Sequence, residues 1–146
     1  MKTILLIDDN TDDLQFIREA IYHEDNNIQC LSFVFGDEAV VALLNGFIER
    51  PDMIFINLNM TGGLRLLQVL RSSHFDDLPV AAYVPQMTGM LSALLNETGL
   101  VFAFEKPNTI RDWKNAVREV LTSVQAPNVD LEILIADSRN QLFYYP

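Results

Sequence analysis

Four polar residues stand where apolar runs of this sequence end, and their side chains could do chemistry together. Asp8 and Asp9 follow one run, Asn57 closes another, and Lys106 follows a third. Adjacent carboxylates are hard oxygen ligands of the kind that Mg²⁺ prefers. A lysine ammonium suits a phosphoryl oxygen or a carboxylate. Taken alone, the two acids are explained more simply as the first turn of a helix. Their combination with Lys106 is what indicates a site.

Short apolar runs must position these residues. Such runs are typical of strands buried on both faces of a parallel sheet, and we expect strands at residues 3–7, 28–33, 53–57, 79–84 and 101–104. Segments with apolar residues three and four apart follow the strands and predict amphipathic helices, at residues 10–22, 36–44, 64–70, 87–96 and 108–126. The alternation of strands and helices predicts a doubly wound α/β fold with a parallel sheet.

Details of three helices can also be predicted. Asn10 and Asn108 stand where N-caps belong, at the start of the first and last helices. Two helices have recognisable buried stripes. The second helix should bury Ala39, Val40, Leu43 and Leu44, and the last should bury Trp113, Ala116, Val117, Val120 and Leu121.

The fold class predicts where a site would form. In doubly wound sheets, sites lie beyond the carboxyl ends of the strands, where the strand order reverses. Residues far apart in the sequence therefore become neighbours there, namely Asp8, Asp9, Asn57, Val84 and Lys106.

Composition narrows the range of functions. The chain has 146 residues, which suits one globular domain. Its net charge is −10, with 20 acidic against 10 basic residues, so we expect no binding to nucleic acid or to anionic membranes. No apolar run approaches the roughly 20 residues that span a bilayer. The first apolar run is too short for a signal peptide, so we expect a cytoplasmic protein.

Four segments together resemble the receiver domains of response regulators in two-component signalling. They are Ile4–Asp9, Asp52–Met60, Leu78–Val80 and Phe104–Pro107. The resemblance covers residues 1 to about 125 in order, and it is specific only when the segments are taken together. It implies a flavodoxin-like sheet of five parallel strands in the order 2-1-3-4-5, with helices on both faces.

The resemblance also implies roles for residues at the acceptor site, and this chain departs from the most important one. In the family, the third strand ends in an aspartate that accepts phosphate from a histidine kinase, and here that position is Asn57. In the family, the paired acids hold Mg²⁺ together with a backbone carbonyl. The corresponding groups here are the side chains of Asp8 and Asp9 and the backbone carbonyl of Asn59. A carboxamide is uncharged and a poor nucleophile, so a stable acyl phosphate should not form. With one carboxylate fewer, any Mg²⁺ should bind weakly, and no other cofactor is expected.

Two further positions of the family's switch also differ. Val84 falls where the family has a hydroxyl that bonds the phosphoryl group, and Ala103 falls near the aromatic residue that acts as readout. The family's phosphate-neutralising lysine is retained as Lys106. Without a phosphate to bind, Lys106 could pair with Asp9, an arrangement we expect as much as a residual metal site. Several departures at one site favour a naturally degenerate receiver over a single engineered change.

Residues 127–146 differ from the rest and form a second segment, after a receiver-like domain at residues 1–126. Pro127 ends the last helix, and two apolar stretches, Val129–Ile135 and Gln141–Tyr145, flank a turn at Asp137–Asn140. This pattern predicts a β-hairpin. A lone hairpin is marginally stable, so it should pack on the chain's own helices or on a second copy. A homodimer is one expected arrangement. The other is a hairpin that masks the partner surface at residues 87–121.

The sequence therefore predicts a non-enzymatic pseudo-receiver of a phosphorelay system that acts through protein contacts. Its partner would be a histidine kinase, a phosphotransfer protein or a downstream signalling protein. One alternative is a normal phosphoaccepting receiver carrying an engineered aspartate-to-asparagine change at position 57. Another is a flavodoxin-like enzyme without a signalling role, although the glycine-rich and phosphate-binding loops of such enzymes are missing after the first strand. A displaced phosphoacceptor at Thr11, Thr61 or Thr88 is the least favoured.

Overall fold

A parallel sheet forms the centre of the molecule, seen in a computed structural model that describes residues 1–97, 101–125, 133–136 and 142–145. Its first five strands are β1 (Thr3–Ile7), β2 (Gln29–Phe33), β3 (Met53–Asn57), β4 (Val80–Val84) and β5 (Val101–Glu105). They are hydrogen-bonded in the order β2-β1-β3-β4-β5, and every pair among them is parallel. The predicted flavodoxin-like fold is confirmed, and the strand order reverses between β1 and β3.

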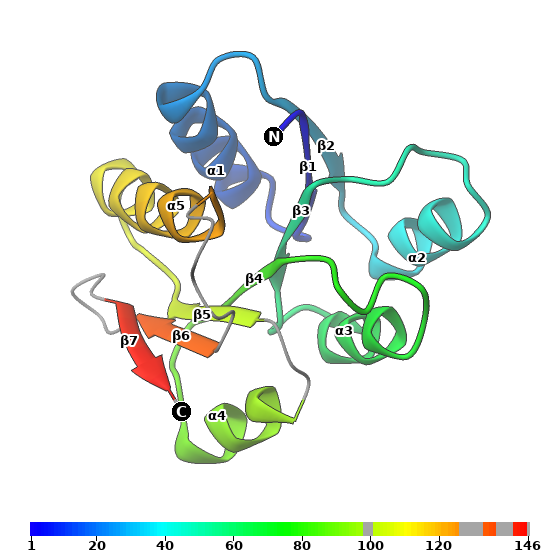
Figure 1. Cartoon of the computed structure of the whole chain (residues 1–146). Helices are drawn as coiled ribbons and strands as arrows, with labels where there is room; N and C mark the ends of the chain where they lie inside the picture. The colour runs from blue at the N-terminus through cyan, green and yellow to red at the C-terminus, as the bar shows by residue number, and fades with distance from the viewer. Residues whose placement is uncertain (98–100, 126–132, 137–141, 146) are drawn as a thin grey trace.

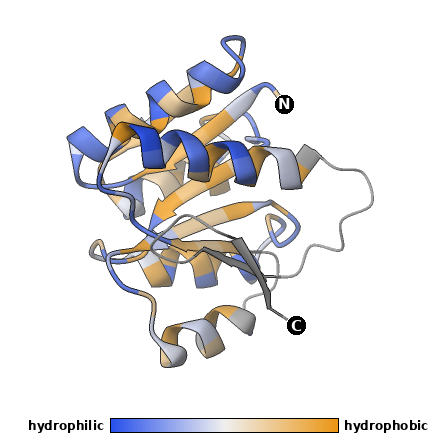
Figure 2. Ribbon diagram, turned by 90° about the vertical axis from the view of Figure 1, so that its left-hand side faces the viewer, coloured by the Kyte–Doolittle hydropathy of each residue, from blue (hydrophilic) through white to orange (hydrophobic). Residues whose placement is uncertain are grey.

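Helices cover both faces of this sheet (Figure 1). They are α1 (Thr11–Glu24), α2 (Gly36–Leu44), α3 (Gly63–Arg71), α4 (Gly89–Asn96) and α5 (Ile110–Gln125). The buried residues of α1 and α5 form one core with the sheet, and those of α2, α3 and α4 form the other. Every residue of β3 and β4 is buried. This burial explains why the strands are continuous apolar runs, visible in the hydropathy colouring of Figure 2.

The helix starts agree with the sequence at one predicted cap and not at the other. The Asn10 side chain accepts hydrogen bonds from the backbone N–H groups of Asp12 and Asp13, at 2.9 and 3.1 Å. At α5, the Thr109 hydroxyl accepts from the Asp112 N–H at 3.1 Å, so Thr109 caps this helix and the prediction of Asn108 was wrong. Both residue types favour N-caps. Which of two neighbours serves depends on where the helical turn begins.

The buried stripe of α2 differs from the predicted one. Ala39 and Leu43 are buried as expected, but Ala42 takes a place in the core, Val40 is only partly buried and Leu44 is 42% exposed. Residues 39–44 are apolar on every side of the helix, so periodicity could not decide which side faces the sheet. The predicted stripe of α5 is buried throughout, because polar residues there mark the solvent side.

Two strands at the carboxyl end extend the sheet. β6 (Ile133–Ala136) pairs in parallel with β5, and β7 (Leu142–Tyr145) pairs antiparallel with β6. The antiparallel pair agrees with the predicted hairpin, although its turn and residues 129–132 lie outside the described residues. β6 covers the edge of β5. β5 lies within residues 87–121, the segment expected to form the partner surface. Within the described part of the chain, no helix is both long and apolar enough to cross a membrane.

Candidate functional site at the carboxyl ends of the strands

Three side chains from three strands meet at the point where the strand order reverses. Asp8 follows β1, Asn57 ends β3, and Tyr83 lies beside Asn57 in the register of β4. The Asp8 side chain is fully buried, and Asn57 is only 9% exposed. The prediction that Asp8 and Asn57 are neighbours is therefore correct, whereas Tyr83 was not foreseen.

The Asp8 carboxylate accepts hydrogen bonds from three protein groups. Its Oδ1 accepts from the backbone N–H of Asn10 at 2.9 Å and from Asn57 Nδ2 at 3.1 Å. Its Oδ2 accepts from the Tyr83 hydroxyl at 2.7 Å. A buried carboxylate is costly unless donors surround it. Here both of its oxygens are satisfied by the protein.

Asn57 is suited to this position by having both a donor and an acceptor. While its Nδ2 donates to Asp8, its Oδ1 accepts from the backbone N–H of Asn59 at 2.9 Å. These two partners together decide the orientation of the amide, because a flipped side chain would lose both bonds. An ionised aspartate could make only the second bond and would face Asp8 with like charge.

The ionisation of Asp8 and Tyr83 follows from the same burial. Burial is the largest cause that raises the pKa of Asp8 above its usual value, and the hydrogen bonds from Asn10, Tyr83 and Asn57 oppose that rise. Burial, followed by the charge of Asp8, raises the pKa of Tyr83 well above its usual value. The phenol therefore keeps its proton near neutral pH and acts as a donor to Asp8.

Lys106 pairs with a different acid from the one expected. Its Nζ lies 2.5 Å from Oδ2 of Asp13, whose side chain is only 7% exposed in the first turn of α1. The predicted pairing of Lys106 with Asp9 was therefore wrong. The ammonium still joins the loop after β5 to the start of α1. The lysine is thus paired with an acid of the chain itself.

The two residues expected at the family's switch positions lie in the core and offer no polar side chain. Val84 is buried, and its carbonyl accepts from the Lys106 backbone N–H at 2.7 Å. Ala103 is buried in the core beneath α2, α3 and α4. The neighbouring Phe102 and Phe104 lie in the opposite core. No aromatic side chain of β5 therefore stands at the position of Ala103.

Tyr83 connects the polar site to an aromatic cluster beneath α5. Its ring lies 5.1 Å from that of Trp113, edge to face, and 5.6 Å from that of Phe104. A buried tyrosine needs a partner for its hydroxyl. That need was the available signal, because Tyr83 is the one residue with a polar group in the strand Val80–Val84.

The residues present do not fit a divalent cation as they are arranged. The amide donor of Asn57 points at the carboxylate that would have to bind the metal, and Tyr83 occupies the other oxygen. Asp9 and Asn59 are exposed. Among the described residues, no group of three or more histidine, cysteine or acidic side chains could hold a metal ion. A cation between Asp8 and Asn57 would have to displace the hydrogen bond that joins them.

Comparison with known proteins shows which solved structures share the fold of this chain. No protein-family model and no curated protein matches the sequence. Solved structures do match. The phosphorylated cyanobacterial phytochrome response regulator RcpA has a TM-score of 0.76 and 19% identity over 88% of this chain and 96% of its own. The Mn²⁺-bound response regulator Rcp1 has a TM-score of 0.73 and 19% identity, covering 90% and 99%.

A chemotaxis protein has the same architecture. Vibrio cholerae CheY4 has a TM-score of 0.67 and 17% identity, covering 82% of this chain and 98% of its own. These three proteins share the sheet and helices described above at low sequence identity. The chain thus has the fold of response-regulator receiver domains.

Proposed function

We propose that this protein is a pseudo-receiver, a signalling module of the response-regulator type that is not phosphorylated on β3 and acts through protein contacts. The observation that carries the proposal is the hydrogen bond from Asn57 to Asp8. It puts an amide donor where a phosphoacceptor would need a nucleophilic oxygen. The module is not an enzyme in this proposal, because the same bond leaves no free base beside a nucleophile.

The surroundings of Asn57 favour a natural asparagine over an engineered one. A single change would leave the other parts of a phosphate site in place. Instead, Val84 supplies no hydroxyl, Ala103 supplies no aromatic ring, and the Tyr83 phenol donates to Asp8. The donors from β3 and β4 complement one another around a single carboxylate. A flavodoxin-like enzyme is supported by none of these contacts.

Incubation with a small phosphodonor tests the proposal directly. We expect acetyl phosphate with Mg²⁺ to leave the intact mass unchanged, because the Asn57 amide has no oxygen nucleophile to form an acyl phosphate. The Asn57→Asp variant under the same conditions is the matched control for accessibility of the pocket. A gain of one phosphoryl group in the wild-type protein, on Asn57 or on any threonine, would overturn the proposal.

We propose that the partner is a protein of a phosphorelay, either a histidine kinase, a phosphotransfer protein or a downstream signalling protein, and that the protein is cytoplasmic. Mg²⁺ binds only weakly in this proposal, because internal donors already satisfy Asp8. The net charge of −10 supports a partner that is neither nucleic acid nor an anionic membrane.

We also propose that residues 1–126 are the receiver-like domain and that residues 127–146 are an extension that covers the sheet edge. α5 ends at Gln125, and β6 then covers the edge of β5. A chain ending at Gln125 should stay folded but expose unpaired main-chain groups of β5. We expect a lower melting temperature and more self-association by light scattering. If neither changes, the extension does not cover this edge, and homodimerisation through it is excluded as well.

A further inference from the structure

Several large apolar side chains lie on the solvent side of α2 and beside this helix. Four of the most exposed large hydrophobic side chains lie in or beside this helix, with exposed fractions of 61% for Phe35, 48% for Val41, 42% for Leu44 and 73% for Phe47. Single exposed apolar residues are ordinary, but a group of them on one element marks a contact surface. α2 has already buried its opposite side, through Ala39, Ala42 and Leu43, against the sheet.

The exposed residues follow a helical contact pattern. Asp37, Val40, Val41 and Leu44 are spaced by three, one and three residues, which places them on one stripe of the helix. α2 therefore has two apolar sides, and only one of them packs against the sheet. The second stripe ends at Asp37, in the first turn, so it is apolar along its length and acidic at its start.

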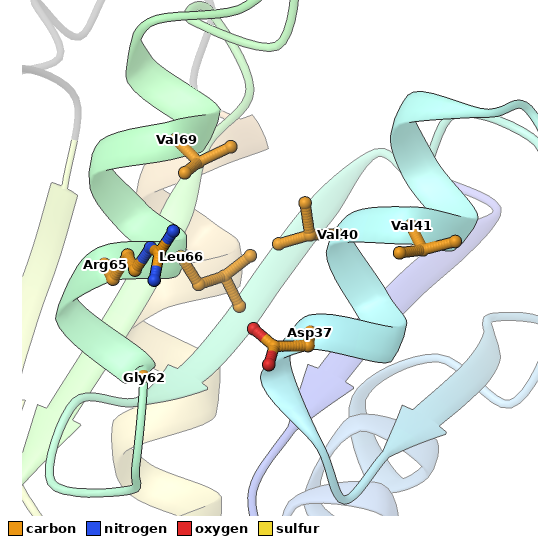
Figure 3. Close-up of a pocket in the computed structure, with 7 residues that line it drawn as sticks. All are labelled: Asp37, Val40, Val41, Gly62, Arg65, Leu66 and Val69. Atoms are coloured by element: carbon orange, nitrogen blue, oxygen red, sulfur yellow. The ribbon is translucent and has the colours of Figure 1, made fainter.

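A groove runs between this stripe and α3. Its hollow has a volume of about 330 Å³, and Figure 3 shows Val40 and Leu66 projecting toward each other from the two helices. We call it the α2–α3 groove and define it by Val40, Val41, Leu66 and Val69, with Asp37 on one side and Arg65 on the other. A groove between two parallel ridges of side chains is the shape that a third helix fills.

The charges at one end indicate which helix would fit. A second hollow of about 480 Å³ adjoins the groove, and Asp9 and Asp37 line it together with Arg65. Among the described side chains, none of these three takes part in an ion pair within the chain. Glu38, next to Asp37, is exposed as well. Carboxylates outnumber the single guanidinium, so this end attracts a cation.

We propose that the α2–α3 groove binds an amphipathic helix of a partner protein, with its apolar face on Val41 and Val69 and a basic residue beside Asp37. A second copy of this chain fits less well, because each copy has a net charge of −10. The inference rests on the proposed protein-binding function and names its surface, which lies on the opposite side of the sheet from α5.

Binding of designed helical peptides to the full chain tests this. The probes are an alanine-rich peptide of about 18 residues with leucines three and four apart and flanking lysines, the same peptide with glutamates in place of lysines, and a scrambled version. We expect the lysine peptide to bind about tenfold more tightly than the other two, by fluorescence anisotropy. Amide chemical shifts should change in residues 35–47 and 62–69.

Two variants locate the binding surface. Val41→Lys should weaken binding of the lysine peptide about tenfold, without changing the melting temperature, because the side chain is exposed. Met90→Lys is the matched control, since Met90 is 85% exposed on α4. Loss of binding in Met90→Lys alone would move the surface to α4 and overturn the proposal.

Other outcomes also overturn it. Equal binding of all three peptides would mean nonspecific adhesion, and concentration-dependent dimers that Val41→Lys disrupts would make a second copy the occupant. The phosphodonor experiment is independent of this one. A phosphorylated protein that still binds the lysine peptide would refute the pseudo-receiver proposal alone, and an unphosphorylated protein that binds none would refute the groove alone.

Discussion

Two regions of this molecule differ in which side chains they bury and which they expose to solvent. At the carboxyl ends of β1, β3 and β4, polar side chains are buried and satisfy one another: Asp8 accepts from Asn57 and Tyr83. On α2 and just beyond its end, apolar side chains such as Val41 and Phe47 are exposed to solvent. The first region satisfies its buried polar groups internally, whereas the second leaves apolar side chains exposed.

The difference supports the two proposals made above, a site without phosphoacceptor chemistry and a contact surface on α2. A site that reacts or binds a metal has to leave at least one polar group available. In this protein, the polar groups of the candidate site are turned toward each other, and Lys106 is paired with Asp13. Apolar surface in water is unfavourable for the isolated protein, so its presence on α2 is consistent with a contact made elsewhere.

The largest expected difference in stability is between two variants, each with one aromatic side chain replaced by alanine in one of the two regions. Tyr83→Ala should lower the free energy of unfolding by about 3–5 kcal/mol, because it leaves a cavity beside Trp113 and removes a donor from Asp8. Phe47→Ala should change it by no more than about 0.5 kcal/mol, since Phe47 is 73% exposed. Urea denaturation of both variants measures this contrast.

Tyr83→Phe separates the two causes of that loss. It keeps the ring and removes only the hydroxyl, so it should cost about 1–2 kcal/mol, as expected for a buried acceptor that loses its partner. If Tyr83→Phe is as stable as the wild type, the phenol is not needed to satisfy Asp8. The description of this region as self-satisfied would then fail.

A smaller effect is expected from restoring a carboxylate at position 57. Without metal, Asn57→Asp should lower the free energy of unfolding by about 1–3 kcal/mol, because the donor to Asp8 is lost and two carboxylates face each other. Millimolar Mg²⁺ should raise the melting temperature of the variant more than that of the wild type. Thermal denaturation with and without the cation measures both parts.

Sodium chloride at the same ionic strength as Mg²⁺ and an excess of chelator are the controls for salt. Equal stabilisation of the two proteins by Mg²⁺ would show that position 57 does not face the cation. Val84 still lacks a hydroxyl in this variant, so regained metal binding need not bring back a working switch.

The smallest effect is a dependence on pH that belongs to Asp8. Burial raises the pKa of Asp8 above its ordinary value of 3.8. The stability that protonated Asp8 contributes is therefore fully present below pH 3.8 and is lost as the pH rises through the raised pKa. Relative to Asp8→Asn, the wild type should lose stability over that interval and then stay level.

Comparing the wild type with the Asp8→Asn variant separates the pH dependence of Asp8 from that of the other acids. Hydrogen bonds from Thr3 and Lys2 lower the pKa of Asp52, and the Arg50 side chain lowers that of Asp77, so these acids have the opposite dependence on pH. Both proteins retain them, and their effect cancels in the difference. A difference in unfolding free energy that stays constant from pH 3 to pH 7 would contradict the raised pKa.

Much of the fold was predictable from the sequence for a local reason. Strands buried on both faces are continuous apolar runs, and helices that pack on one side repeat every three to four residues. These signals located the five strands of the receiver fold and the cap at Asn10. The local signal failed on α2, where apolar residues surround the helix, and the predicted burial of Leu44 was wrong.

The chemical character of position 57 also came from the sequence alone. A carboxamide at Asn57 is a poor nucleophile whatever surrounds it, and its neighbourhood with Asp8 followed from the rule for doubly wound sheets. Only the tertiary structure decided which contacts close the site. The Tyr83 hydroxyl donates to Asp8, which is 75 positions away in the sequence, and Lys106 pairs with Asp13 and not with Asp9. Such choices depend on strand register and on the direction in which each side chain leaves its element, and both are set by the packing of the whole chain.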